Sequence, residues 1–269
     1  MFHRGTYVWG GILILVGILL FLSNLGILVI DVWKVIVPSI VILIGILTIW
    51  GTTRPARELE ARSVQLPLEG AARAALRLRF GAGRLAVHGG ASAASLLDGT
   101  FRGGVESQLR RIGSEARVDL RVPSDFILNV FSPWMWWSGH RLEWDVSLAE
   151  SIPVSLDVET GASEAVLDLT RLMVDELRLS SGASSCQIRM PSGMSLTKAR
   201  IEAGAASLDI AIPDGVSAQI RVEGGLAGVR VNAARFPKVD KTYRSPDYDT
   251  AAKRLDLRIE AGVASVDVN

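Results

Sequence analysis

Two long apolar runs open the chain, before any regular alternation of apolar and polar residues begins. Residues 8–30 contain no charged side chain, and residues 35–50 form a second apolar run shortly after Asp31 and Lys34. A helix needs roughly 20 apolar residues to cross a bilayer, and the first run provides them. The second run approaches this length when the stem of Lys34 lies along the membrane with its ammonium group in water. We therefore expect a transmembrane helical hairpin over residues 1–53.

Tryptophans stand at the ends of these runs. Trp9, Trp33 and Trp50 occupy positions where indole rings favour the headgroup region of a bilayer. A cleaved signal peptide is the alternative, but a second apolar run follows at once and no clear small-x-small cleavage site is present. The turn of the hairpin is expected within residues 23–34.

The bases that flank the hairpin predict its orientation. Arg4 precedes the first run, and Arg54 and Arg57 follow the second, whereas the turn carries one lysine and one aspartate. The positive-inside rule then places both flanks in the cytoplasm. We expect a multi-pass membrane protein whose remaining residues form a domain on the cytoplasmic side.

Beyond the hairpin the pattern changes to strict alternation, which is typical of strands with one buried face. A unit of the form apolar-x-x-Gly recurs between the alternating stretches, and its glycines are Gly81, Gly161, Gly182, Gly204, Gly225 and Gly262. The four central glycines are spaced 21, 22 and 21 residues apart. Such a fixed period predicts stacked supersecondary units that bury their apolar faces against one another.

Each unit reads as a strand, a tight corner at the glycine, a second strand and a turn. The glycine permits either a positive φ or a close approach to a neighbouring chain segment. Turn sequences lie at matching places, at 191–193 and 213–215. The fold class that we expect is a membrane-anchored all-β protein with a repetitive β-solenoid-like domain, or else a layered antiparallel array.

The pattern also predicts how the chain divides. Residues 54–75 are rich in Arg, Ala and Glu and read as a linker. Residues 76–150 form a less regular N-terminal β subdomain, and residues 151–269 form the glycine-punctuated repeats. An insertion at about 233–252 interrupts the period, so that residues 259–268 become the last unit.

Composition excludes several classes of function. Beyond residue 53, basic and acidic residues are equal in number, so no basic excess for binding nucleic acid is present. His3, His88 and His140 show no metal-ligand spacing, and the single cysteine, Cys186, lies on the apolar face of a strand. We predict no catalytic residue, no cofactor and no metal site, and hence a protein that is not an enzyme.

One cluster stands apart from the alternation. Trp134, Met135, Trp136 and Trp137 are adjacent, so a regular strand could not bury all four side chains. Two interpretations remain open. The cluster is either a plug that caps one end of the solenoid, or an exposed patch that enters the membrane or binds a partner.

The apolar runs and the repeats together resemble a known family. The segments GGILILVGILLFL and VWKVIVPSIVILIGIL resemble the LiaI–LiaF-like transmembrane region, and residues 168–182 (DLTRLMVDELRLSSG) resemble the toast-rack domain of bacterial LiaF-like proteins. The resemblance implies a repetitive β fold in the bacterial cell envelope. In the best-known members, the role is to restrain a histidine-kinase stress system. Residues 88–150 match the family weakly.

Two non-enzymatic functions follow as expectations. The first is a membrane-anchored regulator or scaffold of the envelope stress response, which acts through protein–protein contacts. Its expected partners are membrane lipid, a membrane sensor kinase or its accessory proteins, and further copies of the chain. The second is a display or adhesin-like module, which requires the β domain to lie outside the cell. Fold alone does not decide between them.

Overall fold

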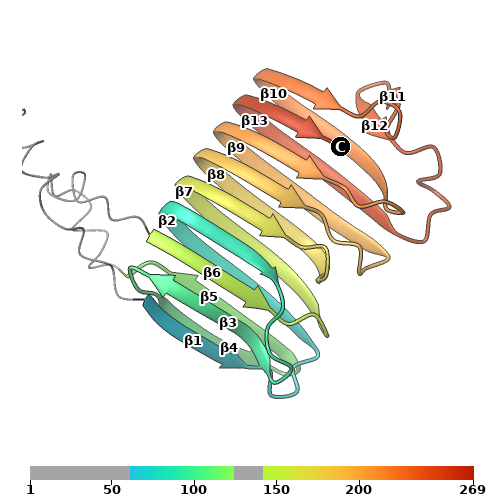
Figure 1. Ribbon diagram of the computed structural model, residues 1–269. Coiled ribbons are helices and arrows are strands. Elements are labelled where there is room, and N and C mark those ends of the chain that lie inside the picture. Colours follow the sequence, from blue (N-terminus) through green and yellow to red (C-terminus); the bar gives the residue numbers. More distant parts are fainter. Residues whose placement is uncertain (1–60, 124–141) are drawn as a thin grey trace, which may run out of the picture. The chain divides into compact units, whose positions relative to one another are not determined.

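The computed structural model describes residues 61–123 and 142–269, which belong to one compact unit built of β-strands in two layers (Figure 1). Within these ranges, no helix has the length and apolar character needed to span a membrane. The predicted transmembrane hairpin over residues 1–53 lies outside the described residues.

Long strands form the repeats, and shorter ones form the two ends. The long strands are β2 (Arg73–Gly89), β7 (Pro153–Asp168), β8 (Met173–Arg189), β9 (Leu196–Ala211), β10 (Ser217–Val231) and β13 (Arg254–Val268). The short strands are β1 (Ala61–Pro67), β3 (Ser95–Arg102), β4 (Glu106–Ile112), β5 (Glu115–Arg121), β6 (Leu142–Leu148), β11 (Lys238–Val239) and β12 (Thr242–Arg244).

Each long strand bends at its glycine, and β7 shows how. Every second residue from Val154 to Thr160 is buried, but Gly161 and Ala162 are both exposed, and burial then resumes at Ser163 with the opposite parity. Since alternate residues of a strand face opposite sides, this shift turns both halves of the strand toward one shared core. We call the half before the glycine the first layer, the half after it the second layer, and the bend between them the corner edge.

The long strands pair in parallel along their whole length, which makes the domain a β-solenoid. Leu179 of β8 lies beside Val158 of β7 and Ile201 of β9, and the register continues beyond the corner. The alternative of a layered antiparallel array is therefore wrong for the repeats. Within the described ranges, antiparallel pairs occur at the two ends, where short strands pair with one another and β12 pairs with the long strand β10.

At four of the six corner positions, Gly161, Gly182, Gly204 and Gly262, glycine is required by the close approach of a neighbouring strand. None of the six corner glycines has a positive φ, so backbone conformation is not the reason for glycine at these positions. Instead, a Cβ atom on Gly182 would lie 3.0 Å from the carbonyl oxygen of Gly161, and one on Gly204 would lie 3.0 Å from that of Gly182. Only a residue without a side chain allows successive corners to stack this closely.

Near the N-terminal end, one turn of the solenoid is divided between two strands. The first half of β2 pairs with β5 and the second half pairs with β6, so β5 and β6 occupy the two layers of a single turn. The chain leaves β5 at Val122 and returns at Leu142, both beside the corner of β2.

The start of β1 lies at the same edge. Ala61 pairs with Arg102 of β3, Arg102 pairs with Glu143 of β6, and Glu143 pairs with Arg84 of β2, which follows the corner directly. Residues 61–67 thus form a strand within the segment 54–75 that was predicted to be a linker. That prediction is wrong for β1, whose inner-facing positions are Arg62, Val64 and Leu66, of which Val64 and Leu66 pack against the core.

The C-terminal strand does not lie at the end of the solenoid. β13 inserts between β9 and β10 and is parallel to both, and the short strands β11 and β12 extend the sheet beyond β10. The interpretation of residues 259–268 as the last unit is therefore correct in chain order but wrong in space. The insertion at 233–252 contains β11 and β12 and allows the chain to return to the gap.

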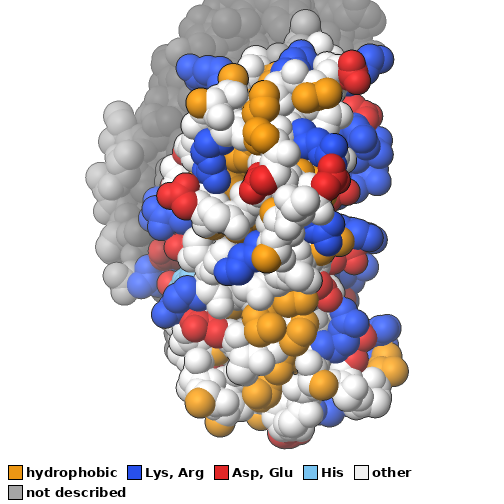
Figure 2. Space-filling view, turned by 90° about the vertical axis from the view of Figure 1, so that its right-hand side faces the viewer, with side chains coloured by type: hydrophobic (Ala, Val, Ile, Leu, Met, Phe, Trp, Pro, Cys, Tyr) orange, Lys and Arg blue, Asp and Glu red, His pale blue; other side chains and the backbone are white. Residues whose placement is uncertain are grey.

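The core between the layers consists mainly of aliphatic side chains, with a cluster of aromatic rings toward the N-terminal end and Phe236 buried after β10. Trp144 is fully buried, and its ring centroid lies 5.2 Å from those of Phe80 and Phe101. Cys186 is also buried, beside the hydroxyl group of Ser184 at 3.4 Å. Figure 2 shows the edge opposite the corners, where hydrophobic side chains lie along the middle with charged groups on both sides.

Candidate functional site

The outer face of the first layer carries rows of charged side chains, because parallel strands in register place equivalent residues side by side. One row contains Asp119, Arg77, Asp157, Arg178, Arg200, Arg258 and Arg221. The row nearer the corner contains Arg121, Arg79, Glu159, Ser180, Glu202, Glu260 and Glu223. Neighbouring strands lie about 4.8 Å apart, so adjacent charges of a row are within reach of one another.

Ion pairs connect the two rows. The guanidinium of Arg200 donates to Glu202 at 2.8 Å and lies 3.0 Å from Glu260, and Arg258 lies 2.9 Å from Glu260. These side chains are largely solvent-exposed, so each pair adds little to stability. Their effect is to place opposite charges beside one another, which gives the face a striped charge pattern.

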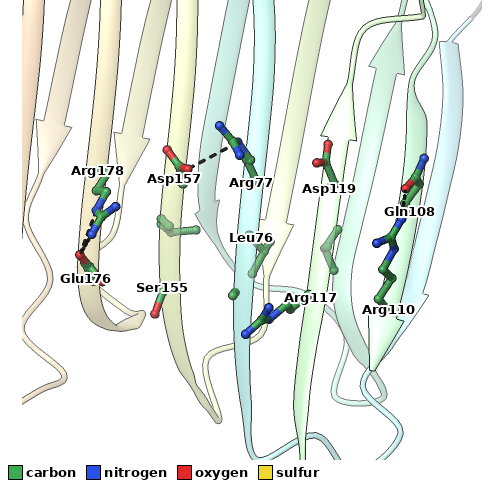
Figure 3. A pocket seen from close by; sticks show the side chains of 13 residues that line it. Leu76, Arg77, Gln108, Arg110, Arg117, Asp119, Ser155, Asp157, Glu176 and Arg178 are labelled. Carbon is green, nitrogen blue, oxygen red and sulfur yellow. Dashed lines mark hydrogen bonds and ion pairs between the residues drawn. The ribbon is translucent and has the colours of Figure 1, made fainter. Parts of the chain in front are cut away.

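A trough lies on this face in the row two residues before Arg77, because two neighbouring positions of that row hold small residues. Ala75 and Ser155 lie between Arg117 on one side and Glu176 on the other, leaving a hollow of about 620 Å³ (Figure 3). Arg110 of β4 also lines it and is within 3.4 Å of Gln108.

The rim of the trough is charged with both signs. Arg117 donates to Glu115 at 2.7 Å, and Arg178 lies 2.8 Å from Glu176. Arg77 donates to Glu159 and also lies 3.5 Å from Asp157, and the hydrogen bond to Glu159 together with attraction by both carboxylates raises its pKa. A permanent cation among carboxylates can orient a polar partner. The guanidinium of Arg77 does not serve as a proton donor or a nucleophile near neutral pH.

One histidine has an environment that favours its charged form. His88 lies on the outer face of the second layer, with Nδ1 2.8 Å from the carbonyl oxygen of Gly89 and Nε2 2.8 Å from Asp145. Because both ring nitrogens face acceptors, protonation lets both donate. The hydrogen bond to Gly89, aided by Asp145, raises the pKa of His88 above its usual 6.5, although partial burial and Arg171 oppose the shift.

The residues predicted from the sequence fall in different places. The six glycines line the corner edge, with Gly225 of β10 beside Gly262 of β13. Trp134, Met135, Trp136 and Trp137 lie outside the described residues, and only the attachment of their segment at the corner edge is established. Trp144, which follows them in the chain, is a core residue of β6.

The charged rows were not identified from the sequence. The sequence does contain a pattern that predicts them. Arg178, Arg200 and Arg221 are spaced 22 and 21 residues apart, with the same period as the glycines. Among the described residues, no group of three His, Cys, Asp or Glu side chains could hold a metal ion.

The fold and its surface define a class: a parallel β-solenoid that presents a rigid, charged face and is joined to an apolar N-terminal segment. The family model described as the N-terminal domain of toast_rack, DUF2154, matches residues 55–211, and the LiaI-LiaF-like transmembrane region matches residues 7–49. The chain belongs to the toast-rack family, as the sequence resemblance predicted. These matches fit a membrane-anchored, non-enzymatic module.

A solved structure has the same fold. A crystal structure of a candidate cell adhesion protein from Clostridium sporogenes superimposes with a TM-score of 0.69 at 23% sequence identity, covering 78% of this chain and 98% of the other. At this identity the likeness establishes the fold alone. No curated protein matches the sequence significantly.

Proposed function

We propose that this protein is a membrane-anchored regulator or scaffold that restrains a bacterial envelope-stress signalling system through protein–protein contacts. The main observation in support of this proposal is that one chain contains both a transmembrane region and a toast-rack solenoid. A LiaI-LiaF-like transmembrane region at residues 7–49 is followed by a toast-rack solenoid whose first strand begins at Ala61. A membrane tether confines the solenoid near other membrane proteins and raises its effective concentration toward them.

The charged face of the first layer is suited to such contacts. Its arginines lie beside carboxylates, and the trough beside Ala75 provides a concave site for a polar segment of a partner. A membrane sensor kinase or an accessory protein of such a kinase is the partner that we propose, with the solenoid in the cytoplasm and the N-terminal segment crossing the membrane twice.

Deletion of the gene tests this function. Expression of envelope-stress genes is measured with and without an antibiotic that blocks cell-wall synthesis. Removal of a restraining regulator should raise basal expression, and reintroduction of the gene should lower it again. Unchanged expression under both conditions would contradict the regulatory role.

An adhesin-like module is the second candidate function, favoured by the description of the Clostridium sporogenes protein as a candidate cell adhesion protein. This role requires the solenoid to lie outside the cell. A reporter enzyme that is active only outside the membrane, fused to Asn269, distinguishes the two. Strong reporter activity supports the adhesin, and inactivity supports the cytoplasmic regulator.

A further inference from the structure

The corner edge has two ends of opposite charge. In the two rows that flank the corner, strands β2, β3 and β5 carry Arg79, Arg84, Arg102 and Arg121, while β4 and β6 carry Glu106 and Glu143. The same two rows on β7 to β10 and β13 contain no base and carry Glu159, Glu164, Glu202, Glu223 and Glu260. A basic part of the edge is thus followed by an acidic part.

The basic part is also where the chain connects to the membrane region. β1 begins at Ala61, beside Arg102 and close to the corner of β2. The family match places the transmembrane region at 7–49, so residues 50–60 are the connection. At roughly 3.6 Å per extended residue, this connection spans at most about 40 Å. The basic end is therefore held within reach of the bilayer surface.

Two arginines of this end can also contact a group other than the carboxylate beside them. Arg102 lies 2.7 Å from Glu143, and Arg84 lies 3.1 Å from Glu164, and both arginine side chains are more than half exposed, at 56% and 57%. Such exposed pairs are weak and exchange readily. Bacterial membranes present anionic headgroups, which attract bases close to the surface.

We infer that the part of the corner edge formed by β1 to β6 is a docking surface for anionic lipid headgroups, which orients the solenoid with its acidic C-terminal end away from the bilayer. This surface requires only the membrane anchor, so it does not depend on a role in stress signalling. Its function is to fix which face of the solenoid is presented to neighbouring membrane proteins.

The repeats supply matched positions for a test. Ala82 and Ala205 are both exposed and follow the glycines of their corners, but Ala82 lies at the basic end and Ala205 at the acidic end. Cys186 is buried, so a dye attaches selectively to Ala82→Cys or Ala205→Cys. The full-length chain is placed in bilayers that contain a headgroup-attached quencher, made either of phosphatidylcholine alone or with added phosphatidylglycerol.

Phosphatidylglycerol should increase quenching of the dye at position 82 roughly two-fold or more, and high salt should reverse this increase, whereas position 205 should respond little. Arg84→Glu with Arg102→Glu should abolish the response, and Arg189→Glu with Lys253→Glu, which changes two exposed bases at the edge opposite the corners, should preserve it. Equal quenching at position 82 in both bilayers would overturn the inference. This comparison needs no charge variant, so it stands even if those variants fold poorly.

Discussion

The position that a Cβ atom would take on Gly161 lies 2.5 Å from the carbonyl oxygen of Gly81 on the neighbouring strand. Among the described residues, none would lie within 4 Å of the equivalent atom on Gly81, because β5 ends opposite Arg79 and β6 begins opposite Gly83. Gly161→Ala should therefore destabilise the domain by about 1–3 kcal/mol, the usual cost of an overpacked site. Gly81→Ala is the matched control and should cost much less. Chemical denaturation of both variants measures the difference, and equal midpoints would show that the corners are not close-packed.

Because β13 lies inside the sheet although it comes last in the chain, truncating its core residues should cost more stability than truncating those of β10. Ile259 of β13 and Val222 of β10 occupy adjacent positions in the same row. Ile259 is fully buried between two strands, whereas Val222 is only partly buried beside the end of the sheet. Ile259→Ala should cost about 2–5 kcal/mol, as core truncations do, and Val222→Ala clearly less. If β13 formed the last turn, Val222→Ala would be the more damaging variant.

The two groups of tryptophan should respond differently to substitution. Trp144 is fully buried between Phe80 and Phe101, so Trp144→Ala should destabilise the domain by about 3–5 kcal/mol. The interpretation of the neighbouring cluster as an exposed patch predicts that Trp136→Ser with Trp137→Ser leaves the unfolding temperature nearly unchanged and weakens contact with lipid or a partner. Unfolding of this double variant would instead identify the cluster as a structural plug.

Stability should depend on pH through His88. Its pKa is raised in the folded state, so the stabilisation is fully present below the unfolded value of 6.5 and is lost as pH rises through the folded value. The stability difference between wild type and His88→Gln should therefore be larger at mildly acidic than at alkaline pH. Because His88 and Asp145 are both partly exposed, the change should be small. A difference that is constant with pH would mean that His88 is not held in its charged form.

Period-two alternation and the recurring glycines were sufficient to predict a stacked β domain, because each strand must bury one face. They could not decide between parallel and antiparallel pairing, since both bury the same residues. They also could not place β13. Ile201, Ile259 and Val222 occupy the same row, so the core is equally well filled by β10 and β13 in either order.

The charged face was missed for a related reason. Exposed arginines and glutamates on a single strand are typical of any solvated surface. Only the register between strands aligns Arg178 with Arg200 and Arg258 and creates the trough beside Ala75. The strand β1 was missed because Pro67 and a polar outer face resemble a linker, and its pairing with β3 depends on residues far along the chain.

The solenoid is proposed to act by binding at the membrane surface, and rescue of the deletion strain tests whether this position is needed. Basal expression of envelope-stress genes is compared after reintroducing the full chain, residues 54–269 alone, or residues 54–269 behind an unrelated membrane anchor, all at equal protein levels. The account predicts that the full chain and the re-anchored solenoid restore low expression and that the unanchored solenoid does not. Full restoration by residues 54–269 alone, or failure of the full chain to restore low expression, would contradict it.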